Sequence, residues 1–315
     1  MTVSLIARAG ILAASLAVAS VLVFGVVNVL PGDPAVVILG TDATPATLHT
    51  LREQLGLDHP GWERYLEWVA GMLHGDFGRS VISKTPVAPD LLEKLTVSGP
   101  LAVISMLVAV AVSLPLGLLA GVHHRRLSGA LVGAISLGGI AIPAFWFGLL
   151  LVTVFAVRLG WLPAGGFTPW DEDPLLALRS LTLPAAALGL IQAAVLTRYV
   201  RAAIVGVQRE DFIRTARAKG LTRWQALRRH GFRNAAIPVV TVLGVQLTSL
   251  LVGAIVIENV FVLPGLGRLL LQAIGNRDLV TVQDLVMLLT AAVLVVNFLV
   301  DVSYRLIDPR IRVSR

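Results

Sequence analysis

Cysteine is absent from the 315-residue chain, and charged residues make up only 14% of it. Without cysteine, the chain cannot hold a disulfide framework or a thiolate-ligated metal. The low charge occurs together with 56% hydrophobic residues and a mean hydropathy of +0.82. These values lie outside the range of soluble globular proteins and are typical of polytopic membrane proteins. The composition therefore favours an all-α membrane protein.

Six apolar segments are long enough to cross a bilayer, which needs about 20 residues. They are Ala9–Leu30, Pro100–Val122, Ala130–Val157, Leu181–Tyr199, Ala235–Ile257 and Leu285–Val302. The first is too long for the apolar core of a signal peptide, and no convincing small-residue cleavage site follows it. We interpret it as a retained first span.

The distribution of Lys and Arg predicts that both termini lie in the cytoplasm, because cytoplasmic loops carry the excess of basic residues. With this orientation, 17 of the 26 basic residues but only four of the 19 acids are cytoplasmic. The 17 are Arg8, Arg125, Arg126, ten residues between Arg198 and Arg233, and four in the C-terminal tail. Membrane topology thus accounts for the net charge of +7, and nucleic acid is not an expected partner.

A long outer loop, Pro31–Gly99, is predicted after the first span, dividing residues 1–98 from a five-helix core, 99–315. Apolar residues three and four apart predict amphipathic helices at Ala46–Leu57 and Trp62–Leu73. We expect these helices to lie on the outer membrane surface or to cap the bundle, with substrate contact as the alternative. The segment Gly78–Thr85 (GRSVISKT) resembles a phosphate-binding loop, but Ser83 replaces its last glycine. We therefore expect no nucleotide hydrolysis by this chain.

The spans carry no ionisable residue near their centres, which disfavours an ion-coupled carrier. Gln192, Gln246 and Asn297 are the neutral polar residues at that depth. We expect them to form hydrogen bonds between helices, with lining of a substrate pathway as the alternative. The six histidines show no metal-binding spacing and no catalytic motif occurs, so an enzyme is not expected.

The most informative segment is Asp211–Pro238, DFIRTARAKGLTRWQALRRHGFRNAAIP. Its pattern predicts a short basic helix that ends at Gly220 in a left-handed C-cap. Thr222 and Gln225 form a capping-box pattern that starts a second helix, and Pro238 marks the start of the next span. Such a polar helical elbow must rest on protein or on lipid headgroups.

This segment resembles the cytoplasmic loop of ABC importer permeases of the dipeptide, oligopeptide and nickel type. The general pattern of the loop in this family is E-A-A-x-x-x-G. In this chain Arg214 replaces the Glu and Thr215 replaces the first Ala, whereas Ala216 and Gly220 match the pattern. Further motifs extend the resemblance over nearly the whole chain: LPGDP (30–34), LREQLGLDHP (51–60), HGDFGRS (74–80), AIPAFWFG (141–148), ENVFVLPGLGRLLLQAIGNRD (258–278) and DPRIR (308–312).

The resemblance implies a type I importer bundle of six transmembrane helices in the cytoplasmic (inner) membrane of a bacterium or archaeon. This chain would be a non-catalytic permease that couples ATPase motion to alternating access. The implied partners are a second, homologous permease, two cytoplasmic ATPase subunits that bind ATP and Mg, and an extracytoplasmic solute-binding protein. No metal or cofactor is expected on this chain.

Within the coupling loop, residues 200–235, the resemblance implies a set of ATPase-docking residues: Asp211, Arg214, Thr215, Ala216, Lys219, Gly220 and Leu221. Di- or oligopeptides are the expected cargo. The alternatives are nickel or another small solute carried by the same architecture, and a stand-alone secondary carrier or membrane scaffold.

Overall fold

The computed structural model describes residues 2–29, 34–39, 43–54 and 58–307. Within these ranges the regular structure is helical, apart from an isolated bridge between Arg79 and Pro86. The all-α architecture predicted from the composition is therefore confirmed.

Five long helices confirm the first, second, fourth, fifth and sixth predicted spans. They are α1 (Thr2–Val29), α5 (Val87–Val122), α8 (Pro174–Val207), α11 (Phe232–Val260) and α13 (Leu279–Ile307). Helix α5 begins at Val87, well before the predicted Pro100, so the helix extends into the predicted outer loop. The hydropathy pattern located only the apolar part of α5, because its first turns carry Asp90, Glu93 and Lys94.

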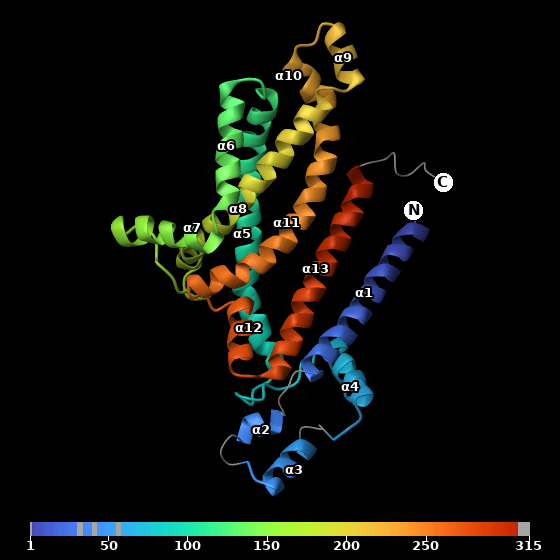
Figure 1. Ribbon diagram of the computed structural model, residues 1–315, viewed down its shortest axis with the longest axis vertical. Coiled ribbons are helices and arrows are strands. Elements are labelled where there is room, and N and C mark those ends of the chain that lie inside the picture. The colour runs from blue at the N-terminus through green and yellow to red at the C-terminus, as the bar shows by residue number, and fades with distance from the viewer. Residues whose placement is uncertain (1, 30–33, 40–42, 55–57, 308–315) are drawn as a thin grey trace.

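The third predicted span, Ala130–Val157, is not one straight helix. It consists of α6 (Leu127–Ala141) followed by α7 (Ala144–Leu151) and the π-helical η2 (Val152–Arg158), with a bend of 100° between the two parts. Pro143 explains the break: it disfavours helical geometry in the preceding residue, and Ile142 is extended at φ −88° and ψ 123°. Figure 1 shows α7 pointing sideways from the foot of α6.

Helix α8 is the most buried span and packs most extensively against α5. Glycines of α5 make this close contact possible: a Cβ at Gly117 would lie 2.5 Å from the Cβ of Val200, and one at Gly121 would lie 2.7 Å from that of Ile204.

At one edge of the molecule, α1 runs beside α13 (Figure 1). Arg8 and Asp301 join these two helices through an ion pair of 2.8 Å.

Four short helices gather at one end of the bundle (Figure 1): α2 (Pro34–Leu39), α3 (Pro45–Gln54), α4 (Gly61–Leu73) and α12 (Leu266–Gly275). The prediction for α4 is confirmed to within one residue. Helix α3 is confirmed in part, since residues 55–57 of its predicted range lie outside the described residues. Helices α2 and α12 were not predicted. At the opposite end lie the start of α1, the end of α13 and the elbow.

Candidate functional site

The elbow, at the end of the bundle opposite α12, begins with α9 (Asp211–Ala218). Gly220 follows with φ +91°, which confirms the predicted left-handed cap. The predicted capping box is also present: the Gln225 amide donates to Thr222 Oγ1 at 3.3 Å, and the Thr222 amide donates to Gln225 Oε1 at 2.9 Å. Local sequence thus determines the shape of the elbow.

The second elbow helix is not separate from the next span, which corrects the prediction that the span starts at Pro238. Helix α10 (Arg223–Ala226) continues through a π-helical turn, η3 (Leu227–Gly231), directly into α11. Pro238 lies inside α11; it removes one backbone donor without ending the helix, as neighbouring helices permit in membrane bundles. The elbow is therefore mechanically continuous with α11.

The inner face of the elbow is buried against two spans. Ile213 and Leu227 are each 1% exposed, and they share one apolar cluster with residues of α8 and α11. The cluster comprises Leu196, Val200, Ile204, Val207, Ile213, Ala216, Ala226, Leu227, Ala235 and Val239. Because close-packed side chains transmit displacement, a force on the elbow reaches the adjoining ends of α8 and α11.

Among the predicted docking residues, Asp211, Arg214, Thr215, Lys219 and Gly220 are exposed. Arg214 pairs with Asp211 at 2.7 Å. Leu221 is half-buried and packs against the apolar cluster of the elbow. Ala216 faces the same cluster and is buried, so its small side chain packs within this chain; its role in docking stays a prediction.

The docking residues predicted from the sequence do not include two exposed aromatic residues of the elbow. Phe212 is 38% exposed and Trp224 45% exposed, the latter edge-on to Phe232 at 5.7 Å between ring centroids. Aromatic residues in such partly exposed positions are enriched at protein interfaces. Phe212 beside Ile213 was the available signal, because adjacent helical side chains point about 100° apart and one of the two can face outward.

Of the three neutral polar residues predicted near the centres of the spans, Gln192 and Gln246 bond to each other, and Asn297 does not. Gln246 Nε2 donates to Gln192 Oε1 at 2.9 Å, and Gln192 Nε2 donates to the Gln246 carbonyl at 3.4 Å. The predicted interhelical hydrogen bonding is thus confirmed between α8 and α11. Asn297 is exposed on α13 and does not join them. Pathway lining by these residues stays a prediction.

An apolar cavity of about 430 Å³ lies between α5, α8 and α11, next to the elbow. It shares Leu196, Val200, Ile204, Ala235 and Val239 with the elbow cluster. The elbow cluster therefore borders an apolar space between three spans.

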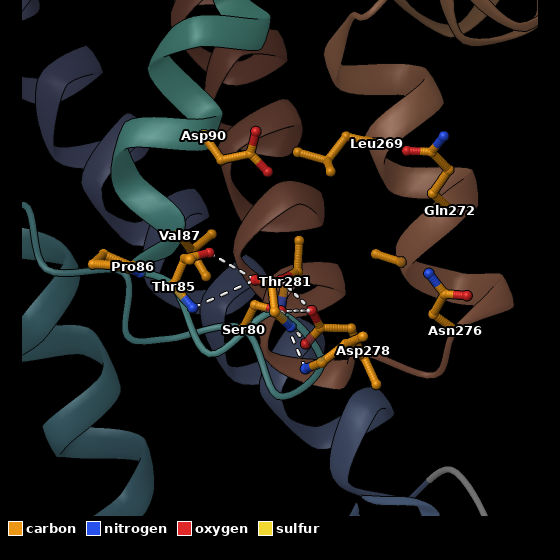
Figure 2. A pocket seen from close by; sticks show the side chains of 13 residues that line it. Ser80, Thr85, Pro86, Val87, Asp90, Leu269, Gln272, Asn276, Asp278 and Thr281 are labelled. Carbon is orange, nitrogen blue, oxygen red and sulfur yellow. Dashed lines mark hydrogen bonds between the residues drawn. The ribbon is translucent and has the colours of Figure 1, made fainter.

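At the end of the bundle opposite the elbow, a polar pocket of about 150 Å³ lies between the turn Ser80–Thr85, the start of α5 and α12 (Figure 2). Asp278 fixes one wall of it. Its carboxylate accepts hydrogen bonds from Ser80 Oγ at 2.5 Å, the Val81 amide at 3.1 Å and Thr281 Oγ1 at 2.8 Å. The segment that resembled a phosphate-binding loop is thus fastened to the start of α13.

Helix α12 is held in place by Glu258, at the end of α11. The Glu258 carboxylate accepts from Ser98 Oγ at 2.6 Å, and from the amides of Gly267 at 2.7 Å and Arg268 at 3.2 Å. Backbone donors in the first turn of a helix lack intrahelical partners, so this buried carboxylate caps α12. Over the residues that the structure describes, no group of three or more His, Asp or Glu side chains could hold a metal ion.

A bundle of long apolar helices with an elbow joined to two of them defines a polytopic membrane protein of the permease class. The family model for the binding-protein-dependent transport system inner membrane component matches residues 113–313, and the model for the N-terminal part of such components matches residues 1–93. The chain belongs to this family and is a permease subunit of an ABC importer.

Curated relatives match along nearly the full length. A protein named as a peptide transport system permease of Brucella abortus (strain 2308) is 42% identical over 299 residues, covering 94% of each chain. The glutathione transport system permease protein GsiC of Escherichia coli (strain K12) is 41% identical over 298 residues, covering 95% of each chain.

Solved structures support the fold. An inward-facing structure of the MetNI methionine ABC transporter aligns with a TM-score of 0.54 at 20% identity, covering 70% of this chain and 96% of that one. An amino acid ABC transporter solved with histidines aligns with a TM-score of 0.53 at 16% identity, covering 69% and 94%. The predicted type I importer bundle is thereby confirmed.

Proposed function

We propose that this permease subunit imports peptides. The support comes from relatives at 41–42% identity, whose names specify peptide and glutathione transport. Glutathione is itself a tripeptide, so both names describe small peptide-like solutes. Nickel or another small solute is the alternative cargo for the same architecture.

Within this function, the elbow is the surface on which a cytoplasmic ATPase subunit docks. One observation carries the proposal: the inner face of α9 and α10 is packed into α8 and α11, while the outer face exposes Phe212, Trp224 and charged residues. A surface of this kind can receive a partner and transmit its movement to two spans. ATP-driven closure of the ATPase pair would then bias the bundle between its two access states.

The complete importer contains a second, homologous permease, two ATPase subunits and an extracytoplasmic solute-binding protein in the cytoplasmic membrane. ATP and Mg bind to the ATPase subunits, and both termini and the elbow of this chain face the cytoplasm. The support is the basic character of the elbow end, where Arg125 and Arg217 both lie within electrostatic reach of Arg223.

Gly220 provides the test of docking. A valine there cannot easily adopt φ +91°, whereas asparagine visits this region more readily. We expect Gly220→Val to insert in the membrane but to lose both co-purification of the cognate ATPase and uptake. Gly220→Asn, the matched control, should retain both. Full ATPase binding and uptake by Gly220→Val would refute docking through the elbow.

Cargo is tested separately in a host that lacks its own peptide importers. Co-expression of the complete importer should support uptake of labelled di- and tripeptides above the level of a host without this permease. Uptake of ⁶³Ni²⁺ by the same cells, with no peptide uptake, would identify the alternative. Because the docking test measures ATPase binding directly, its outcome does not depend on the cargo.

A further inference from the structure

Helix α4 presents three different faces, and only one of them packs against the spans among the residues that the structure describes. On the packed face, Tyr65 and Trp68 contact Phe24 of α1, with ring centroids 5.5 and 5.9 Å apart. The Tyr65 hydroxyl lies 2.9 Å from Ser20 Oγ of α1, and Trp68 Nε1 donates to Asp284 of α13 at 2.8 Å. This face anchors α4 to the first and last spans.

The second face of α4 is apolar and uncovered. Trp62, Leu66 and Leu73 are 64%, 56% and 81% exposed. Their spacing of four and seven residues places them on one side of the helix. The third face carries Glu63 and exposed Glu67, and Glu63 pairs with His59 at 3.4 Å. Helix α4 is thus amphipathic on the part of its surface that the bundle leaves free.

The contacts of α4 also fix its depth. Ser20 lies nine residues before the end of α1 at Val29, about 14 Å along the helix axis at 1.5 Å per residue. Asp284 lies five residues after the start of α13 at Leu279, about 8 Å along its axis. Helix α4 therefore lies beside the outer turns of two membrane spans, and Figure 1 shows it along the outer part of α1.

At this level α1 itself exposes apolar side chains, Val18, Leu22 and Val26, on the side turned away from Ser20 and Phe24. A span surface of this composition faces lipid. Tryptophan favours the boundary between headgroups and acyl chains, and a helix with one apolar and one charged face lies in the plane of that boundary. The position of α4 beside two spans and its residue types thus favour the same occupant, lipid.

We propose that α4 is an interfacial helix seated in the outer leaflet, with Trp62, Leu66 and Leu73 inserted among lipid chains. Glu63 and Glu67 face the headgroups and water. The lipid then holds α4 from one side, while Phe24, Ser20 and Asp284 hold it from the other. This position keeps the outer ends of α1 and α13 together and does not depend on the cargo.

The absence of cysteine allows a direct test by site-directed spin labelling. Leu66→Cys and Leu73→Cys, with Glu67→Cys as the matched control one residue away, are labelled with a nitroxide in the full-length chain. The protein is reconstituted in bilayers of phosphatidylcholine and phosphatidylglycerol. Collisions with oxygen, which concentrates in lipid, are compared with those of a water-soluble nickel chelate.

We expect the ratio of oxygen to nickel accessibility at positions 66 and 73 to exceed that at 67 severalfold. Equal ratios at all three positions would overturn the proposal and place the face in water. Immobile labels at 66 and 73, shielded from both reagents, would also overturn it and indicate a protein partner.

A second measurement avoids labelling. Lipids brominated near the carbonyl end of their chains should quench tryptophan fluorescence less in Trp62→Phe than in the unmodified chain. Equal fractional quenching of the two proteins would contradict the insertion of Trp62.

Discussion

Trp68 on α4 donates its indole N–H to Asp284 Oδ1 on α13 at 2.8 Å, across 216 residues of sequence. The Asp284 side chain is fully buried, and its Oδ2 has no hydrogen-bond partner among the described residues. The Trp68 indole therefore supplies a hydrogen bond that offsets the cost of burying this carboxyl group. We expect Trp68→Phe to lower the free energy of unfolding by about 1–3 kcal/mol, because a buried polar group loses its partner. Thermal unfolding of the purified chain in detergent measures this change.

Trp62→Phe is the control on the same helix, since Trp62 is exposed and should change the unfolding free energy in detergent little. In the double variant Trp68→Phe with Asp284→Leu, both polar partners are replaced, and much of the lost stability should return. Equal unfolding temperatures for Trp68→Phe and Trp62→Phe would show that the hydrogen bond contributes nothing.

Gly117 sets the distance between α5 and α8. A Cβ there would lie 2.5 Å from the Cβ of Val200 and 3.0 Å from the Thr197 carbonyl oxygen. We expect Gly117→Ala to force the two helices apart and to cost about 1–3 kcal/mol, as overpacking of a tight core does. The unfolding temperature in detergent reports the loss.

Gly206, on α8, is the matched control for Gly117. A Cβ at Gly206 would meet no heavy atom of another segment within 4 Å, and the backbone there is ordinary helix. Gly206→Ala should therefore leave stability unchanged or raise it by about 0.5–1 kcal/mol, because alanine restricts the unfolded chain more than glycine. If both substitutions had the same effect, the close contact at Gly117 would not limit stability.

Local patterns predicted much of this structure. Apolar length located five spans, the spacing of Tyr65, Val69 and Leu73 located α4, and Gly220, Thr222 and Gln225 predicted the elbow. In each case, the physical determinant lies within a few neighbouring residues. The continuity of α10 with α11 was missed because Pro238 suggested a boundary, although a helix in a membrane bundle tolerates the loss of one donor.

The long-range contacts could not be predicted in the same way. The inward orientation of Ala216, the Trp68–Asp284 hydrogen bond and the capping of α12 by Glu258 all join segments whose proximity arises only from packing of the bundle. The sharp bend at Pro143 had a local signal, but its 100° angle depends on where α7 packs. The docking residues of the elbow and the pathway role of Gln192, Gln246 and Asn297 stay predictions.

Glu258 should be essential for the end of the bundle that contains α12. We expect Glu258→Ala to leave the backbone amides of Gly267 and Arg268 without their acceptor. The free energy of unfolding should fall by about 1–3 kcal/mol, because buried donors lose their partner. Glu258→Gln keeps one acceptor oxygen and should recover part of the loss. Hydrogen exchange at the first turn of α12 should rise in the alanine variant, and unchanged exchange there would contradict the capping role.

Two adjacent elbow residues separate folding from docking. Ile213 is 1% exposed and lies in the cluster with α8 and α11, whereas Phe212 is 38% exposed on the outer face. Ile213→Ala should cost about 2–5 kcal/mol of stability, because it leaves a cavity in that cluster. Phe212→Ala should change stability by less than about 0.5 kcal/mol, yet weaken co-purification of the cognate ATPase at least severalfold.

Both variants are compared with the unmodified chain by thermal unfolding and by the amount of ATPase recovered per permease in mild detergent. If the docking surface is as proposed, Phe212→Ala should keep its stability but recover less ATPase. Ile213→Ala should instead unfold at a lower temperature than the unmodified chain. If Phe212→Ala recovered ATPase as well as the unmodified chain, the exposed aromatic residue would not be part of the docking surface. Arg209→Ala, an exposed substitution just before α9, should leave both measurements unchanged and so controls for the loss of any side chain near the elbow.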